Sequence, residues 1–376
     1  MTDASRKVLF FQHSGNNGGA PRSLYQIVDA YEREFGPQTV LFVRKGPVLN
    51  TYSAIKSRIL AGKRLTPFHG SEVSGMSLKL ALRNLMGLAA VPGGYFKYLR
   101  GYDVVYLNSS ALCFYGMMVR LFSPGTRIVC HIREPLLDGA WGAVIRSVLR
   151  RSADHCIAIS RNELSNLRLP DISSEVVYNY VHSTDYAPER GRSLHRKDVK
   201  VGPDKFVAGY FARLDVKNGL GDFLEIARRH EHDPQMAFCI YGHTGDETPD
   251  VKALLAAAGP NVHVYPMVLD VPSNLADLDV LVVPFKKPHF SRSVVEAAML
   301  AVPSVIYDIV SVNETVKDDE TGYVVPLNDV AALSARIAQL KSDPERRAQL
   351  AAAAREFAME SFSERNYARI REAINA

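Results

Sequence analysis

Residues 280–307 read VLVVPFKKPHFSRSVVEAAMLAVPSVIY and contain a complete strand, turn, helix and strand. The apolar run 280–284 has the length of a buried strand, and a turn with two lysines and a histidine follows it. A helix is expected to begin near Ser291, and the apolar run 304–307 predicts the next strand. Because strands that alternate with helices form parallel sheets, this stretch predicts a parallel α/β domain.

The same alternation occurs in both halves of the chain. Strands are expected in the first half at 7–12, 39–44, 104–108, 127–133, 155–160 and 175–179, and in the second half at 206–211, 236–241, 262–265, 280–284, 304–307 and 322–325. A polar, turn-rich stretch at 183–193 predicts a linker between them. A chain of 376 residues also exceeds the size of most single cores. We therefore expect two Rossmann-like parallel-sheet domains that face each other across a cleft.

The composition is that of an ordinary globular protein, with 47% hydrophobic and 23% charged residues. The four cysteines lie far apart at no metal-ligand spacing, and residues 1–7 lack an apolar signal-peptide core, which favours a cytoplasmic protein. Neither of the two most apolar uncharged stretches, 84–96 and 104–119, is long enough to cross a bilayer.

Basic residues are concentrated between positions 51 and 100. That segment holds a single acid, Glu72, against Lys56, Arg58, Lys63, Arg64, Lys79, Arg83, Lys97 and Arg100. Leu, Met, Tyr and Phe are interleaved with these charges in 76–98, a pattern that fits an amphipathic surface lying on anionic lipid. A solvated face of a loop and a helix explains the charges equally well.

Two groups of residues in the first half have the pattern of a ligand site. The turn from Ser14 to Pro21 joins a strand to a helix, and its glycines would let backbone N–H groups approach a diphosphate. The strand 127–133 ends with His131 and Arg133 on the same side and is followed by Glu134. In open α/β sheets, ligands bind at this carboxyl edge of the strands.

Two further groups lie in the second half. Arg213 and Lys217 come just after one strand and just before a helix, where cations attract phosphate groups rather than complement the helix dipole. In the stretch quoted above, Lys286, Lys287 and His289 occupy the turn, and Glu296 lies one turn into the helix, where a carboxylate can accept two hydrogen bonds from a ribose.

Taken in order, these residues resemble the retaining nucleotide-sugar glycosyltransferases of family 4, which have the GT-B fold of two Rossmann-like domains. The likeness covers nearly the whole chain. It rests on Gly18-Gly19, Asn108, 131–134, 158–160, Tyr178-Asn179, 212–214, Tyr241-Gly242, 278–284, 295–297, Asn313-Glu314 and 321–323.

The resemblance implies an N-terminal acceptor-binding domain at 1–182, a C-terminal domain at 183–355 that binds the nucleotide sugar, and a helix at 356–376 that packs back on the N-terminal domain. It implies catalytic roles for His131, Arg133, Arg213 and Lys217, and contact with the acceptor by Asn108 and Glu134. The implied donor-binding residues are Gly18, Gly19, Arg213, Lys217, Gly242, His289, Phe290, Ser291, Ser293, Val294 and Glu296.

By the same resemblance, protein cations would replace a metal ion at the leaving diphosphate. No metal and no cofactor are expected, and the donor is a UDP or GDP sugar. A glycan or a lipid-linked glycan is the expected acceptor, nucleic acid is not an expected partner, and peripheral contact with the inner face of an anionic membrane stays open.

Two positions depart from the family pattern. The first of the two glutamates that usually lie eight residues apart is replaced by Pro288, so recognition of the donor sugar must differ. The phosphate-binding lysine usually stands five residues after the arginine, where this chain has Asn218, and Lys217 comes one residue earlier.

Three functions fit the sequence. The first is a retaining transferase that builds a surface polysaccharide or related glycoconjugate. The second is a catalytically silent GT-B protein that binds a nucleotide sugar or glycan as a partner subunit, which Pro288 favours. The third is a GT-B sugar-nucleotide epimerase, and it ranks last because the matched motifs are those of the transferases.

Overall fold

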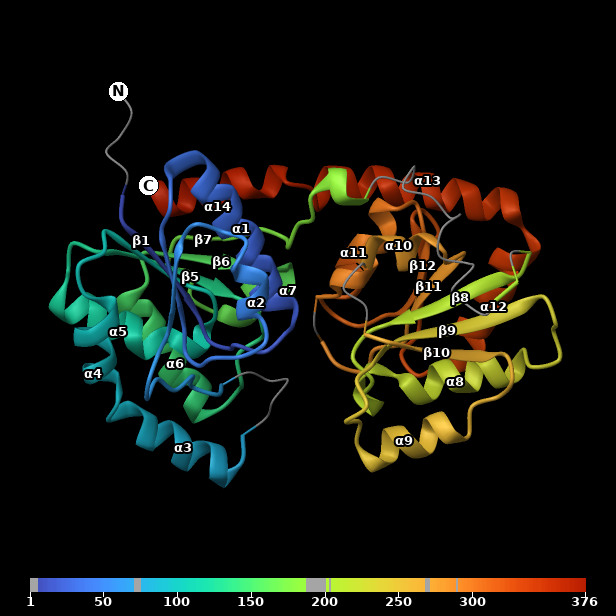
Figure 1. The fold of residues 1–376 in the computed structure, drawn as a ribbon, viewed down its shortest axis with the longest axis horizontal. Helices are drawn as coiled ribbons and strands as arrows, with labels where there is room; N and C mark the ends of the chain where they lie inside the picture. The colour runs from blue at the N-terminus through green and yellow to red at the C-terminus, as the bar shows by residue number, and fades with distance from the viewer. Residues whose placement is uncertain (1–5, 71–75, 187–200, 203, 268–270, 289) are drawn as a thin grey trace. The chain divides into compact units, whose positions relative to one another are not determined.

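The computed structural model describes residues 6–70, 76–186, 201–202, 204–267, 271–288 and 290–376. The chain forms two compact units, here called unit 1 (Met1–Tyr180 with Arg365–Ala376) and unit 2 (Val181–Glu364). Each unit is built on one parallel sheet with helices packed against it (Figure 1). This architecture confirms the prediction of two Rossmann-like parallel-sheet domains.

Unit 1 has a seven-stranded sheet in the order β3-β2-β1-β4-β5-β6-β7. Its strands are β1 Val8–Gln12, β2 Thr39–Phe42, β3 Arg58–Ala61, β4 Val104–Leu107, β5 Arg127–Ile132, β6 His155–Ala158 and β7 Ser174–Val176. Its helices are α1 Gly19–Phe35, α2 Leu49–Tyr52, α3 Leu78–Leu88, α4 Val91–Gly94, α5 Cys113–Phe122, α6 Ala140–Ser152, α7 Arg161–Leu167 and α14 Arg365–Asn375, with short turns η1 Tyr95–Leu99 and η2 Ser110–Leu112.

The core of unit 1 lies on both faces of this sheet. Along β1, Leu9 and Phe11 belong to one apolar cluster, while Val8 and Phe10 belong to another. Successive side chains of a strand point to opposite faces, so a strand buried on both sides reads as a continuous apolar run. That is why the strands of this sheet could be found from short apolar runs.

Unit 2 has a six-stranded sheet in the order β10-β9-β8-β11-β12-β13. Its strands are β8 Phe206–Phe211, β9 Met236–His243, β10 Val262–Pro266, β11 Val280–Val283, β12 Ser304–Tyr307 and β13 Gly322–Val325. Its helices are α8 Leu220–Arg229, α9 Pro249–Ala256, α10 Val271–Ala276, α11 Arg292–Met299, α12 Val330–Ser342 and α13 Pro344–Ser361, with short turns η3 Ser183–Tyr186, η5 Val216–Asn218 and η6 Asn313–Thr315.

The chain ends with a helix of unit 1. Arg127 at the start of β5 donates to the carbonyl of Ala373 in α14 at 2.8 Å, and Tyr31 of α1 donates to Asn375 at 2.7 Å. The preceding helix α13 belongs to unit 2, where Arg355 donates to the carbonyl of Met299. The unit boundaries therefore fall after Tyr180 and after Glu364, where the sequence analysis drew them after 182 and 355.

The structure adds one strand that the sequence analysis did not include. The edge strand β3 pairs only with β2, begins with Arg58 and is half-buried, so it lacks the apolar run that marked the others. The expected linker at 183–193 begins with η3, and its residues 187–193 lie outside the described part of the chain. Among the described residues, no helix combines the length and the apolar character needed to cross a membrane.

Candidate functional site

The order of the strands indicates where each unit can bind a ligand. In unit 1 the order reverses between β1 and β4, and in unit 2 it reverses between β8 and β11. The loops that leave neighbouring strands at such a switch point run to opposite faces of the sheet and leave a crevice at the carboxyl edge. The polar residues singled out in the sequence follow these strands in both units.

In unit 1 a buried hydrogen-bond network joins the ends of β1, β4 and β5. Asn108, directly after β4, is fully buried and donates to the side chain of Gln12 at 2.6 Å and to the carbonyl of Ala20 at 3.1 Å. Its own amide oxygen accepts from Arg133 Nε and Nη2 at 2.8 and 2.7 Å. Asn108 thereby ties the first turn of α1 to the strand ends.

Arg133 is held by its neighbours in a fixed orientation. It is 7% exposed, and besides its two bonds to Asn108 it donates from Nη1 to the side chain of Asn179 at 2.8 Å. Three directed bonds on a planar guanidinium restrain both its position and its plane. The geometry makes Arg133 a buried positive charge that organises the edge of the sheet.

His131 differs from Arg133 because one of its ring nitrogens has no described partner. Its Nδ1 contacts the hydroxyl of Tyr106 and lies 3.3 Å from Arg133 Nη2, while Nε2 is buried with no hydrogen-bond partner among the described residues. Arg133 can only donate, so Nδ1 is the acceptor, and the proton of a neutral ring resides on Nε2. Burial, with the charge of Arg133, holds the pKa of His131 well below its ordinary value.

A second histidine, His13, follows β1 and is partly buried. Burial, then Arg133, then His69, lower the pKa of His13 to about 4. Its Nδ1 has no hydrogen-bond partner in the described structure, and the same holds for Nε2 of Gln12. Buried polar atoms are normally paired, so several unpaired ones at one strand edge are consistent with a site that a polar ligand or water fills.

The glycine turn before α1 is open at its tip and tight at its base. A side chain at Gly18 or Gly19 would meet almost nothing, and both residues are exposed at the start of α1. A Cβ at Gly15 would lie 2.5 Å from the carbonyl oxygen of Arg44, so the base of the turn packs backbone against backbone. Glu134, directly after Arg133, is exposed.

In unit 2 positive side chains gather at the switch point. Arg213 is exposed and lies 3.4 Å from Asp215, and Lys217 is exposed one turn further on. Burial lowers the pKa of Lys287, and the neighbouring ammonium of Lys217 lowers it further. Like charges brought this close repel one another, so a bound anion such as a diphosphate would stabilise the cluster.

Close backbone packing holds the two cation-bearing loops together. Gly219 has φ of 75°, and a Cβ there would lie 1.8 Å from the carbonyl oxygen of Pro284. The backbone N–H of Lys286 donates to the carbonyl of Lys217 at 3.0 Å. At Gly242, near the end of β9, φ is 135° and a Cβ would lie 2.1 Å from the carbonyl oxygen of Ala212. Only glycine fits at these two positions.

One of the two departures from the family pattern, at Asn218, has a local explanation. Asn218 turns its side chain back and donates to the carbonyl of Arg213 at 2.8 Å, so it braces the loop instead of extending from it. Lys286 forms an ion pair at 2.7 Å with Asp222, a residue of α8. Pro288 lies in the turn after Lys287, and the predicted donor residue His289 lies outside the described residues.

Glu296 lies in α11, is 3% exposed and has partners for its carboxylate. Its Oε1 accepts from the hydroxyl of Tyr186 and from Arg292 Nε, each at 2.8 Å. The other predicted donor residues at this helix start are also buried: Phe290, Ser291, Ser293 and Val294. The hydroxyls of Ser291 and Ser293 lie 3.2 Å apart. The helix start is therefore a packed element rather than an open loop.

Several residues of these two edges were missed by sequence reasoning. Arg292 stands four residues before Glu296, a helical ion-pair spacing that could have been found. Tyr186 comes from the linker and Gln12 from the end of β1, and no sequence pattern links either residue to its partner. Lys287 was noted in the turn but not assigned to the donor site.

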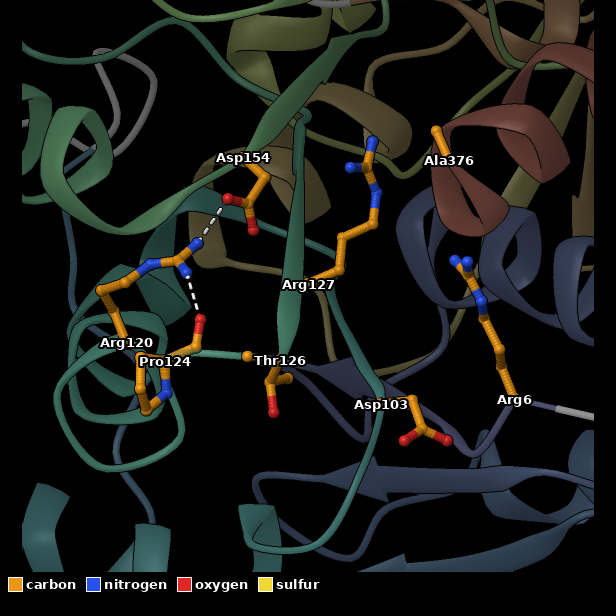
Figure 2. Close-up of a pocket in the computed structure, with 9 residues that line it drawn as sticks. Arg6, Asp103, Arg120, Pro124, Thr126, Arg127, Asp154 and Ala376 are labelled. Carbon is orange, nitrogen blue, oxygen red and sulfur yellow. Dashed lines mark hydrogen bonds and ion pairs between the residues drawn. The ribbon is translucent and has the colours of Figure 1, made fainter.

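A separate cavity lies at the opposite edge of the sheet in unit 1. It has a volume of about 540 Å³ and lies where β4, β5 and β6 begin. Its charged lining consists of Arg6, Arg120 and Arg127 with Asp103 and Asp154, and Arg120 is paired with Asp154 (Figure 2). This cavity contains none of the predicted site residues. Across the described parts of both units, no cluster of His, Cys, Asp and Glu suited to a metal ion occurs.

The second half of the chain matches a known family. Residues 191–357 match the model of the family described as glycosyl transferases group 1. The chain is 30% identical over 174 residues to the 2-deoxystreptamine N-acetyl-D-glucosaminyltransferase of Streptomyces fradiae. This match covers 44% of this chain and 41% of that protein. It is 26% identical over 153 residues to the capsular polysaccharide biosynthesis glycosyltransferase CapM of Staphylococcus aureus, covering 40% of each. The matches thus span less than half the length of these two relatives.

Solved structures share the fold over the whole chain. HepE of Anabaena, solved in complex with UDP and glucose, superposes with a TM-score of 0.80 at 20% identity, covering 99% of this chain and all of that one. Sucrose-phosphate synthase of Thermosynechococcus elongatus superposes with a TM-score of 0.77 at 15% identity, covering 98% of both chains. The architecture is therefore that of the GT-B class.

Proposed function

We propose that the protein is a glycosyltransferase that moves a sugar from a nucleoside diphosphate to the hydroxyl of a glycan or lipid-linked glycan. The observation that carries this proposal is the cluster of Arg213, Lys217 and Lys287 at the switch point of unit 2. That cluster lies within the region that matches the family model. The similarity to the capsular polysaccharide biosynthesis glycosyltransferase CapM supports surface polysaccharide or glycoconjugate synthesis as the setting.

In this proposal the cations of unit 2 bind the diphosphate and stabilise it as it leaves. Negative charge grows on the leaving phosphate as the bond to the sugar breaks. Cations that are already in position stabilise this charge in the transition state. Glu296 binds the ribose hydroxyls, because its carboxylate accepts hydrogen bonds at the mouth of α11. No metal ion is required when two or three protein cations neutralise the same charge.

Unit 1 supplies groups for hydroxyls rather than for phosphates. The Nε2 proton of His131 is a buried donor with no described partner, which makes His131 the better candidate for direct contact with a sugar. Arg133 is already bonded to Asn108 and Asn179 and acts as a positioning residue. Gly18 and Gly19 present open backbone, while Glu134 is an exposed carboxylate that can accept from an acceptor hydroxyl.

The reaction is proposed to retain the configuration at the sugar. The acceptor oxygen bonds to the anomeric carbon on the face from which the diphosphate departs, and a phosphate oxygen of the leaving group takes the acceptor proton. A lipid-linked acceptor would be met at an anionic membrane surface, and the excess of basic residues between 51 and 100 supports peripheral contact there.

The test is a transfer assay with UDP and GDP sugars in the presence of a metal chelator. Release of the nucleoside diphosphate and retention of the anomeric configuration, followed by NMR, are the expected results. Activity that disappears with the chelator would contradict the metal-independent reaction, and an inverted product would contradict retention.

A silent binding subunit is the second candidate, and two observations favour it. Pro288 stands where the family has a glutamate, and the carboxylate of Glu296 is already engaged by Tyr186 and Arg292. This candidate predicts calorimetric binding of one nucleotide sugar with no release of nucleoside diphosphate, even when acceptor glycans are added. Turnover of any donor would remove it.

A further inference from the structure

Helix α3 carries four large apolar side chains on the face that does not pack against its own unit. Leu78, Leu82, Leu85 and Met86 are between 52% and 78% exposed. At about 100° per residue they fall within an arc of about 100° on one side of the helix. Exposed leucines are ordinary when scattered, but a contiguous apolar face is a feature of binding surfaces.

The opposite face attaches α3 to unit 1 through small and polar contacts. Asn84 is fully buried, accepts from the backbone N–H of His69 at 3.0 Å and donates to the carbonyl of His69 at 2.8 Å. A Cβ at Gly87 would lie 3.2 Å from the side chain of Thr66, so the helix backbone packs closely there. The orientation of the helix is therefore specified, and the leucines are exposed as a consequence of it.

The exposed apolar residues of the molecule are concentrated in this region. Eight large hydrophobic side chains that are exposed in the described structure lie between residues 76 and 122: Met76, Leu78, Leu82, Leu85, Met86, Phe96, Leu121 and Phe122. Six others are scattered over the rest of the described chain. Figure 1 shows α3 at the periphery of unit 1, away from the centre of its sheet.

Positive charge accompanies the apolar face and negative charge does not. Lys79 and Arg83 follow next to the leucine arc around the helix, and residues 76–100 contain Lys97 and Arg100 but no aspartate or glutamate. A protein partner with an apolar groove would not require this one-sided charge. A bilayer with anionic headgroups requires both features, since leucines enter the acyl boundary while lysine and arginine reach the headgroups.

We propose that the outer face of α3, formed by Leu78, Leu82, Leu85 and Met86 with Lys79 and Arg83, docks the protein on the surface of an anionic lipid bilayer. The helix lies parallel to the membrane plane with its leucines in the interface. The proposal does not depend on the transferase reaction, because it rests on exposure and charge in unit 1 alone.

The test is co-sedimentation of the full-length protein with vesicles of phosphatidylcholine alone or mixed with phosphatidylglycerol. We expect binding to the mixed vesicles that falls steeply with added salt, and at least tenfold weaker binding to phosphatidylcholine. The variant L82S/L85S should lose at least tenfold in binding to the mixed vesicles. The variant K79Q/R83Q should lose roughly fivefold for each cation removed.

The matched control is Leu327→Ser, which removes an exposed leucine from a turn of unit 2 and should leave vesicle binding unchanged. Nucleotide titration and urea unfolding of L82S/L85S should match the wild type, which separates lost docking from lost folding. The proposal would be overturned if the wild-type protein did not bind anionic vesicles, or if L82S/L85S still bound them as strongly as the wild type. A wild-type dimer that L82S/L85S converts to a monomer would also overturn it, because the leucine face would then be covered by a second copy.

Discussion

The carboxyl edges of the two sheets differ in how their charged side chains are buried and bonded. In unit 1 the residues at the switch point are buried and bonded to one another, with Arg133 enclosed by Asn108 and Asn179. In unit 2 Arg213 and Lys217 are exposed on a loop, which is held by backbone packing, by capping and by the side chain of Asn218. A preorganised edge with orphaned hydrogen-bond atoms suits neutral hydroxyls, whereas a loop of exposed cations suits a phosphate that brings its own charge.

The largest expected effect tests the exposed cluster. Replacing both Arg213 and Lys217 by Ala removes two charge-assisted contacts, each worth about 2 kcal/mol, so the affinity for UDP or GDP should fall about a thousandfold. Titration calorimetry measures it. The control R228A/R229A removes the same charge from α8, where both arginines pair with Glu225, and should change affinity little. Equal losses in both variants would mean that only net charge matters.

The second prediction tests the enclosed edge. Asn108→Ala leaves the buried guanidinium of Arg133 without one acceptor, which should cost about 3 kcal/mol in the free energy of unfolding. Urea denaturation measures it, with the exposed Asn50→Ala as control. A loss below about 1 kcal/mol would show that water replaces the amide and that the guanidinium of Arg133 is accessible to solvent.

The third prediction concerns Glu296. Substitution by Gln keeps the shape but weakens the acceptor, and nucleotide affinity should fall roughly thirtyfold, which corresponds to about 2 kcal/mol. Uracil or guanine bases without ribose should bind the variant and the wild type alike. An unchanged dissociation constant for the nucleotide would assign Glu296 to packing with Tyr186 and Arg292 alone.

The last prediction is a pH dependence of stability that comes from His13 in unit 1. The pKa of His13 is lowered to about 4 in the folded protein, so the unfolded chain binds more protons below its ordinary value near 6.5. The contribution of the neutral His13 ring to the free energy of unfolding is complete above pH 6.5. It is lost as the pH falls toward 4, by at most about 1.4 kcal/mol per pH unit. The variant His13→Gln should flatten this slope in urea titrations between pH 7 and 4.5, and an unaltered slope would mean that His13 is solvated.

The sequence predicted the sheets well because their strands are buried on both faces. Each apolar run of the first half from 7–12 to 175–179 contains or overlaps a strand, and β3 was missed because it is a half-buried edge strand that starts with Arg58. The helix start expected near Ser291 lies within a residue of the observed start at Arg292. Turn chemistry and apolar periodicity are local, which is why they can be found without a structure.

The contacts of the site could not be predicted, since they join residues far apart in the sequence. Tyr186 reaches Glu296 across 110 positions, and Asn108 reaches Gln12 across 96. The resemblance implied roles for both His131 and Arg133, and only the hydrogen bonds favour His131 for direct contact with a ligand. The role of Asn218 also became clear only from a hydrogen bond: its side chain donates to the carbonyl of Arg213, while Lys217 stays exposed.

Calorimetric titration of the wild-type protein with UDP, GDP and their sugars, in the presence of a metal chelator, shows whether protein cations alone hold the diphosphate. We expect one of the two nucleotides to bind without metal and its binding to weaken as salt is added, because protein cations hold the diphosphate. Absence of binding by both nucleotides at millimolar concentration would contradict this expectation, since the cluster of Arg213, Lys217 and Lys287 would then not be a diphosphate site.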